Sequence, residues 1–400
     1  MTLVACAHAQ AQTIPPYEVR DLVLDTADMD FGGLYVDIEG AMAKLGVTRL
    51  QAHEIQRVMR DELETLSGSP SAIQQAPHLK QALADAVDSV VNRGISPSGF
   101  KPLTFKKGEF VVVFDLDETL LTHWYRLSKG TAQERRGSFP LALRDTVPSY
   151  VDRGTGDTVA QPKLMISGSM VQLRPGIDEF TQAVSVLPGC KGFVLFTAKE
   201  DRTADAMIAE WKKRDPYFFS HVLGVLGRNH LRMGNGLAKP SKDMRIFDES
   251  LQHVILLDDN ESRVMQKELC FQIPKFNADS YLVAKGTGRT PVNASIVKAH
   301  ELMLPYAAGA IEHCADEAAL GPANALAQCW SDGLGNGDGT AGAELTGFGV
   351  YLHRQGIDLP AADLTKTFDQ PFEFEFSRPL SGPFPTFKAG KLQGSLLPVQ

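Results

Sequence analysis

The sequence predicts a doubly wound α/β domain, in which helices flank a parallel sheet, between residues 105 and 290. Two observations carry this prediction. Strand-like apolar runs alternate with amphipathic helical patterns along the segment, which is typical of βαβ units. The first run, GEFVVVFDLD at 108–117, has almost no polar alternation, as expected of a strand that is buried on both faces of a parallel sheet.

The later elements follow in the order that such a fold requires. We expect helices where apolar residues recur every three or four positions, from Ile177 to Leu187 and from Ala204 to Trp211. We expect the other strands in three short apolar runs, GFVLFTA at 192–198, HVLGVL at 221–226 and HVILLDDN at 253–260. The pattern SRVMQKEL at 262–269 predicts one more helix.

Further segments lie within and around this domain. Residues 122–173 are too long for a simple connection and contain the β-like run LMISGSMVQL, which indicates a small β-rich flap or cap at the sheet edge. Helical periodicity predicts an N-terminal helical extension over 21–104. Residues 291–400 are expected to form a C-terminal extension that begins helical and then becomes irregular.

Residues 1–20 resemble the remnant of an export signal. Leu3-Val4-Ala5-Cys6 is similar to the bacterial lipobox, and the next three residues are similar to a small-residue cleavage site. We therefore expect a periplasmic, secreted or lipid-anchored protein, with the lipid on Cys6. A basic leader and a longer apolar core are missing here, so the alternative is a chance match in an alanine-rich segment and a cytoplasmic protein.

Composition argues against several classes of function. The net charge of −8 gives no general attraction to nucleic acid or to an anionic membrane face. No apolar run approaches the ~20 residues that span a bilayer. The five cysteines lack CxxC spacing, which argues against a cysteine zinc site. Cys314 and Cys329 either pair in an oxidising compartment or are two independent buried thiols.

Reactive residue types follow three of the predicted strands, and a lysine precedes the last of these strands. In chain order the candidate site residues are Asp115, Asp117, Thr197, Lys242, Asp258 and Asp259. Ligands of open α/β sheets bind beyond the carboxyl ends of the strands, so we expect these side chains to meet there. Lys239 competes with Lys242 for the same position.

This set of residues suits a phosphate monoester. Crowded carboxylates repel one another unless a cation joins them, and Mg²⁺ prefers oxygen ligands and a substrate phosphate. Asp115 is then the candidate nucleophile, which would form an aspartyl-phosphate. Asp117 is the candidate acid and base, and Thr197 and Lys242 are expected to hold phosphoryl oxygens.

The four motifs as an ordered set resemble those of the haloacid dehalogenase (HAD) superfamily. They are FDLDETL, the threonine after VLF, the later lysine and the LDD pair, and they cover roughly 108–285. Three finer features resemble the FCP/SCP-type phosphatases, which are similar to NLI interacting factor: LRPGIDEF, FTAKEDRTADAM, and SKDMRIF before LLDDNE. The resemblance implies a HAD-like three-layer α/β/α fold, a phosphatase and Mg²⁺.

The resemblance also implies roles at single positions. The metal would be bound by Asp115, by the backbone carbonyl of Asp117 and by Asp259, with Asp258 beside them, and Thr119 would support the loop. Arg174 is expected to be structural and to pin the insertion to the domain. The fourth motif here reads Asp-Asp, where the FCP/SCP group often has Asp-Asn. No partner domain for transcription machinery is recognisable, and an export signal conflicts with a nuclear substrate, so fold and chemistry transfer from the group better than substrate does.

Several alternatives stay open. Cys6 and the DLDET string also fit an exported acid phosphatase resembling bacterial class C, which acts on small phosphomonoesters. A second alternative is a catalytically silent binding module on the same fold, although every motif position holds a competent residue. A dehalogenase would need no second aspartate at Asp117, and a phosphomutase would need a larger cap. The substrate is therefore expected to be phosphorylated, as a phosphoprotein, a nucleotide or a sugar phosphate.

Overall fold

The computed structural model divides into two compact units. The first unit comprises residues 1–102 and 229–246, and the second comprises 103–228 and 247–400. The structure describes residues 17–26, 33–66, 72–123, 149–151, 158–160, 164–166, 169–233, 237, 239–276, 281, 293–320, 348, 351–353, 355–357, 359–360, 363–364, 367, 386–388 and 391–393.

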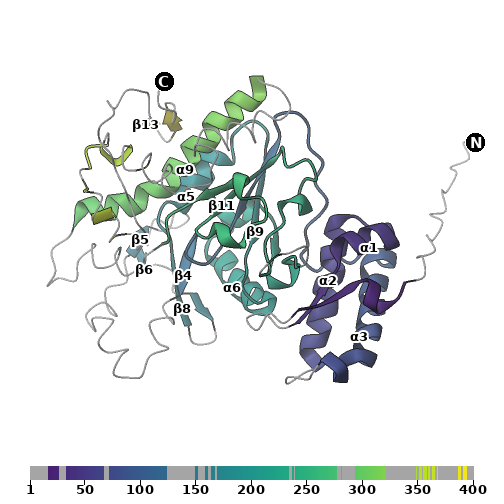
Figure 1. Cartoon of the computed structure of the whole chain (residues 1–400). Coiled ribbons are helices and arrows are strands. Elements are labelled where there is room, and N and C mark those ends of the chain that lie inside the picture. Colours follow the sequence, from purple (N-terminus) through teal and green to yellow (C-terminus); the bar gives the residue numbers. More distant parts are fainter. Residues whose placement is uncertain are drawn as a thin grey trace, which may run out of the picture. The chain divides into compact units, whose positions relative to one another are not determined.

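A five-stranded parallel sheet forms the centre of the second unit, in the order β10-β9-β3-β11-β12 (Figure 1). Its strands are β3 (Phe110–Phe114), β9 (Cys190–Phe196), β10 (Val222–Leu226), β11 (Val254–Asp258) and β12 (Cys270–Gln272). The chain leaves β3 for β9 on one side and later returns to β11 on the other. This reversal of strand order is the place where open α/β sheets bind their ligands.

Both faces of this sheet are buried, as its apolar strands predicted. On one face Phe114 lies 5.1 Å from the ring of Phe180 and 5.7 Å from that of Phe193. The same core cluster takes in side chains of α5 (Ile177–Val184), α6 (Asp201–Arg214) and α7 (Pro216–Ser220). The alternate side chains Val111 and Val113 point to the other face and are also fully buried. The predicted α/β fold with a parallel sheet is therefore confirmed.

The insertion after the first strand is rich in short antiparallel strands. β4 (Leu121–His123), β8 (Ser169–Leu173) and β7 (Leu164–Ile166) form a three-stranded sheet in that order. β5 (Ser149–Val151) pairs with β6 (Thr158–Ala160) separately. These strands confirm the predicted β-rich flap, and most of the middle of the flap lies outside the described residues.

The first unit contains the predicted helices and a hairpin that was not predicted. Its elements are η1 (Val19–Asp21), β1 (Val23–Thr26), β2 (Gly33–Val36), α1 (Ile38–Leu45), α2 (Arg49–Leu66), α3 (Ala72–Val87), the π-helical turn η2 (Asp88–Asn92) and η6 (Met244–Ile246). Gln56 of α2 donates from Nε2 to the carbonyls of Asn229 and Leu231, each at 2.7 Å. Residues 229–246 are thus tied to the N-terminal helices.

A buried ion network also holds residues 229–246 in the first unit. Asp243 is fully buried and lies 3.0 Å from Nη1 of Arg232 and 2.8 Å from Nη2 of Arg245. Arg49 of α2 contributes a third guanidinium, with Nη1 at 3.5 Å. These bonds hold the pKa of the Asp243 carboxyl below its usual range, although burial acts in the opposite direction.

The prediction of a helix at 262–269 is wrong. The segment forms two 3₁₀ turns, η7 (Glu261–Arg263) and η8 (Lys267–Leu269). Extended backbone at Val264, with φ −118° and ψ 132°, separates the turns and interrupts any continuous helix. Val264 and Leu269 are nevertheless buried, so their apolar spacing reflects packing of the two turns.

The C-terminal extension begins with the long helix α9 (Ala294–Leu320), whose side chains join the core cluster of the second unit. Two short strands follow, β13 (Thr386–Lys388) and β14 (Lys391–Gln393). Cys314 is buried on α9, while Cys329 and Cys6 lie outside the described residues, so pairing and export stay predictions.

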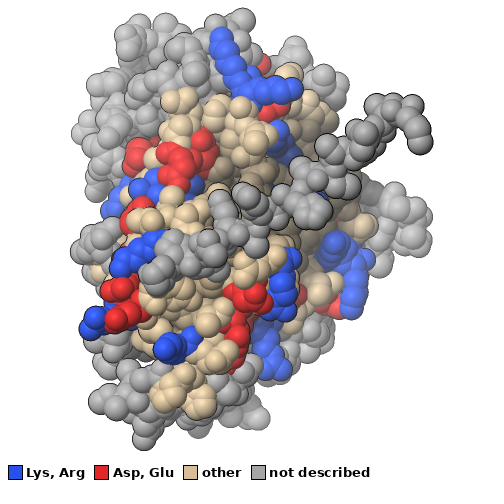
Figure 2. Space-filling model, turned by 90° about the vertical axis from the view of Figure 1, so that its right-hand side faces the viewer, with Lys and Arg blue, Asp and Glu red and all other residues tan. Residues whose placement is uncertain are grey.

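Two features of the described residues bear on membranes and charge. None of their helices combines the length and the apolar character that crossing a bilayer requires. On the face drawn in Figure 2, acidic and basic side chains are interspersed over the residues that are coloured.

Candidate active site

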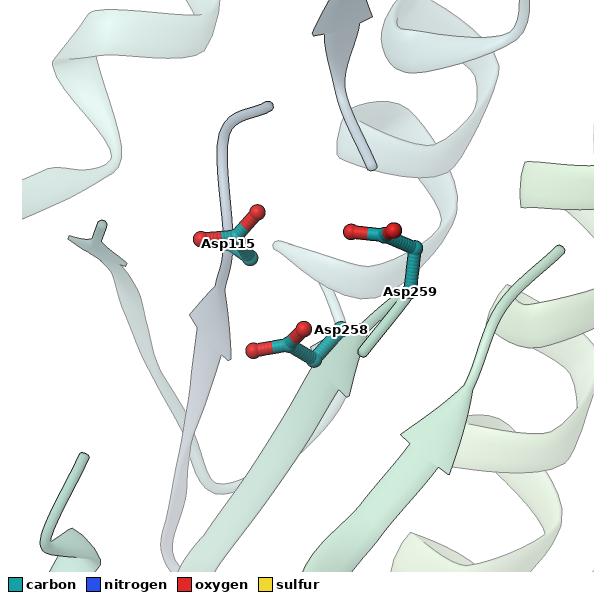
Figure 3. A group of neighbouring side chains, drawn as sticks. All are labelled: Asp115, Asp258 and Asp259. Carbon is teal, nitrogen blue, oxygen red and sulfur yellow. The ribbon is translucent and has the colours of Figure 1, made fainter. Parts of the chain in front are cut away.

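Three aspartates meet at the carboxyl end of the parallel sheet. Asp115 follows β3, and Asp258 and Asp259 end and follow β11. One carboxylate oxygen of each lies within 4.8 Å of the others. Figure 3 shows Asp258 and Asp259 with their carboxyl groups turned toward the end of β3, where Asp115 lies. The predicted meeting of these three residues is therefore observed.

Sheet pairing and one hydroxyl fix this arrangement. The backbone N–H of Asp115 donates to Leu257 O at 3.0 Å, which continues the pairing of β3 with β11. Thr119 Oγ1 donates to Asp259 Oδ1 at 3.2 Å and accepts from the backbone N–H of Asp259 at 2.9 Å. The loop after β3 is thereby fastened to the loop after β11.

The loop that carries Asp117 turns tightly back toward the sheet. The backbone N–H groups of Leu120 and Leu121 both donate to Leu116 O at 3.0 Å. Glu118 adopts a left-handed φ of 66°, which is uncommon for a residue with a side chain. Strained backbone of this kind occurs preferentially at functional sites.

Arg174 links this loop to the connection after β12. It is 2% exposed, donates from Nη1 to Thr119 O at 3.0 Å and donates from Nη2 to Pro274 O. Its own backbone N–H donates to Leu120 O at 2.8 Å. Burial lowers the pKa of Arg174 to about 9, while Asp259 acts in the opposite direction. These contacts are those of a structural residue that supports the acidic site.

Asp117 is not part of the group of three carboxylates. Its Oδ2 lies 2.9 Å from Nζ of Lys199, whose side chain is only 11% exposed. Sequence reasoning considered Lys242 and Lys239 as the cations of the site and missed Lys199. One signal was available, since Lys199 stands two residues after Thr197 in the same turn as the second motif.

The two predicted phosphate-binding residues, Thr197 and Lys242, belong to different units. Thr197 is fully buried at the end of β9, and its Oγ1 accepts a hydrogen bond from the backbone N–H of Lys199 at 3.1 Å. Lys242 is 1% exposed and belongs to the first unit. The roles of Thr197 and Lys242 at a phosphoryl group stay predictions.

The three buried carboxylates suit a hard divalent cation. Asp115, Asp258 and Asp259 are 7%, 2% and 6% exposed, so water screens their repulsion poorly. A cation with oxygen ligands would offset this repulsion, and carboxylates that leave room for a substrate phosphate are the ligands that Mg²⁺ takes. The residues present therefore fit Mg²⁺.

The comparison with protein families identifies the domain. Residues 110–283 match the family model of the NLI interacting factor-like phosphatases. This segment is an NLI interacting factor-like phosphatase domain. The match confirms the expected HAD-type phosphatase of the FCP/SCP group, and the acidic site lies inside the matched residues. None of the curated proteins compared with the chain matches it.

Two solved structures are similar to the chain that carries this phosphatase domain. The first is a variant of the fission yeast RNA polymerase II CTD phosphatase Fcp1 bound to beryllium fluoride, with 17% identity and a TM-score of 0.27. The similarity covers 43% of each chain, so this chain spans less than half of that protein. The second is Fcp1, an essential RNA polymerase II CTD phosphatase, with 14% identity, a TM-score of 0.32 and coverage of 68% of this chain and 83% of that chain.

Proposed function

We propose that this phosphatase is a Mg²⁺-dependent phosphomonoester hydrolase that works through an aspartyl-phosphate, with a phosphoprotein as substrate. The observation that supports the proposal is the group of three buried carboxylates at the switch point of the sheet, with Asp117 beside them. A nucleophile, a metal site and a proton-transfer group then stand on adjacent strands.

In the first half-reaction Asp115 attacks the phosphoryl group. A bond forms between an Asp115 carboxylate oxygen and phosphorus, and the ester P–O bond breaks. The leaving oxygen takes a proton from Asp117 and departs as an alcohol. Thr197 donates a hydrogen bond from its hydroxyl to a phosphoryl oxygen, and Lys242 adds a positive charge in its predicted role.

In the second half-reaction water hydrolyses the aspartyl-phosphate on Asp115. Asp117, now a carboxylate, accepts a proton from the attacking water. The water oxygen bonds to phosphorus, the bond to Asp115 breaks, and orthophosphate leaves. A bound Mg²⁺ would neutralise phosphoryl oxygens so that an anionic nucleophile can approach them. Asp115 and Asp259 would hold it, with Asp258 beside them and the Asp117 carbonyl as a further ligand.

We propose a phosphoprotein as the substrate class because the sequence resembles the FCP/SCP-type phosphatases, and the match to the NLI interacting factor-like phosphatases supports this resemblance. Among the described residues, the flap consists of short strands and forms no large second cap. A large cap would restrict the site to small molecules, so its absence there is compatible with a phosphoprotein. The alternative is a class C-like acid phosphatase that acts on small phosphomonoesters.

One experiment tests the mechanism. Phosphopeptides, nucleotides and sugar phosphates are assayed with Mg²⁺ and with EDTA, for the wild type and for Asp115→Asn. We expect the substitution to lower kcat by more than about a thousandfold. Asp205→Asn, on the exposed side of α6, is the matched control and should change nothing. Turnover that resists both EDTA and Asp115→Asn would refute the mechanism.

A further inference from the structure

The lysine that follows the second motif is held on a rigid turn. Lys199 lies between β9 and α6, and Arg228 fastens this turn at three points. The backbone N–H of Arg228 donates to Lys199 O at 2.8 Å, and its Nε donates to Ala198 O at 3.2 Å. Its Nη1 lies 3.2 Å from Glu200 Oε1. These bonds hold the backbone of Lys199 in place independently of any contact that its side chain makes.

The side chain of Lys199 is directed at the acidic end of the sheet. Most lysine side chains extend into solvent, whereas this one is 11% exposed and places Nζ 2.9 Å from Asp117 Oδ2. A fixed backbone and a nearly buried stem reduce the rotamer entropy that an ion pair must overcome. The pair is therefore better defined than an ordinary surface salt bridge.

This ion pair separates Asp117 from the other acids of the site. β3 lies between β9 and β11 in the sheet. Asp115 meets the two aspartates of β11 on one side. Asp117, two residues later, is bound to the lysine of the turn after β9, on the other side. A freely rotating Asp117 carboxylate could instead turn toward a cation among the three acids and add itself to the ligands.

We propose that Lys199 is a positioning residue that holds the Asp117 carboxylate on the β9 side of the site, where it serves the leaving group. The proposal rests on the proposed function of Asp117. Before the leaving group departs, Asp117 carries a proton and accepts a hydrogen bond from Lys199 Nζ. The ester P–O bond then breaks while the leaving oxygen takes that proton, and the Asp117 carboxylate that remains forms the ion pair with Lys199. Lys199 itself exchanges no proton and forms no bond to phosphorus.

Leaving-group dependence tests this role. A poor leaving group needs protonation as it departs, and a good one does not, so phenyl phosphate and p-nitrophenyl phosphate respond differently to a misplaced acid. We expect Lys199→Met to lower kcat/KM for phenyl phosphate by about a hundredfold and for p-nitrophenyl phosphate by less than about threefold. Lys199→Arg retains the ion pair and should recover most of the loss.

The second unit offers a matched control on the same two strands. Lys191 pairs with Glu109, Nζ to Oε2 at 3.2 Å, at the opposite end of β9 and β3. Lys191→Met removes an ion pair of the same kind away from the site and should leave both rates unchanged. Circular dichroism melts of both variants check that they are folded.

Two outcomes contradict the role of Lys199, and two others refute the proposed function. Equal losses of kcat/KM on both substrates, with KM raised, would mean that Lys199 binds the phosphoryl group directly. No loss on either substrate would mean that the ion pair has no part in the reaction. A wild type that hydrolyses neither substrate with Mg²⁺, or an Asp115→Asn variant that hydrolyses both, would instead refute the proposed function on which this role depends.

Discussion

Single residues decide how the acidic loops are joined, and Thr119 has the central part. Its hydroxyl accepts the Asp259 N–H and donates to the Asp259 carboxylate. Sequence reasoning placed the aspartates at the strand ends because apolar runs stop there, and it gave Thr119 a supporting role. It could not give the partner of Thr119, which stands 140 positions later, nor the pairing of Lys199 with Asp117, because both depend on strand order.

We expect Thr119→Val to destabilise the second unit by about 1–3 kcal/mol, because it leaves the buried N–H of Asp259 without its acceptor. Mg²⁺ should also bind more weakly, since Asp259 loses the bond that orients it. Thr119→Ser should retain both properties. Urea unfolding and calorimetric titration with Mg²⁺ measure the two effects.

Thr181 provides the comparison for this substitution. It is also fully buried, but its hydroxyl donates only to Ile177 O within α5, at 2.7 Å. Thr181→Val removes a side-chain hydrogen bond to Ile177 O, a carbonyl that also accepts within the helix. The substitution should therefore lower the free energy of unfolding by less than Thr119→Val does and leave Mg²⁺ binding unchanged. Equal costs for the two valine variants would contradict the role given to Thr119.

At the scale of elements, the strands of the parallel sheet were predictable from the sequence, but the β1–β2 hairpin and the two turns at 262–269 were not. Runs such as FVVVF are apolar at every position because both faces of β3 are buried, so the sequence alone indicates a central strand. β1 (VLDT) is short and half polar, and it forms only because it pairs with β2. The pattern at 262–269 is apolar at helical spacing but serves two separate turns.

The turn before β9 depends on a glycine. Gly189 has a φ of 88°, and a Cβ at this position would lie 2.1 Å from Gly108 O. Gly189→Ala should therefore destabilise the second unit by about 3 kcal/mol or more, because the two turns that lead into β9 and β3 would have to separate. Tryptophan fluorescence during urea unfolding reports on this unit, which contains all three tryptophans of the chain.

Gly356 serves as a control that separates the strain of a positive φ from the steric clash of a Cβ with Gly108. It has a φ of 74° but open space where a Cβ would stand. Gly356→Ala should lower the free energy of unfolding by about 1–2 kcal/mol, because alanine is strained only by the left-handed backbone there. If the two alanine variants lose the same stability, the close approach of Gly189 to Gly108 is not what requires the glycine.

At the scale of the whole molecule, each unit buries a histidine in its neutral form. His53 of α2 is fully buried in the first unit, and burial lowers its pKa to about 3. His300 of α9 is fully buried in the second unit, and burial again lowers the pKa to about 3. The ionisable groups around His53 are Asp243, His230, Arg49 and Arg232, and Arg174 faces His300.

These two histidines predict that acid weakens both units. The folded pKa lies below the unfolded value of 6.5, so the unfolded chain binds more protons between pH 6.5 and 3. Each histidine then removes about 1.4 kcal/mol of stability for each pH unit below 6.5. Carboxyls with lowered pKa, such as Asp243, contribute mainly below about pH 4.5, so the range from 6.5 to 4.5 is where the effect of the two histidines is measured.

Hydrogen exchange followed by mass spectrometry separates the two units in one sample. Protection factors, corrected for the intrinsic exchange rate, should fall with pH in peptides of both α2 and α9. His53→Leu should flatten this dependence in α2 alone, and His300→Leu should flatten it in α9 alone, because leucine is apolar and does not titrate. A pH dependence that persists unchanged in the substituted unit would show that other groups govern acid unfolding, since the histidine would then have been removed without effect.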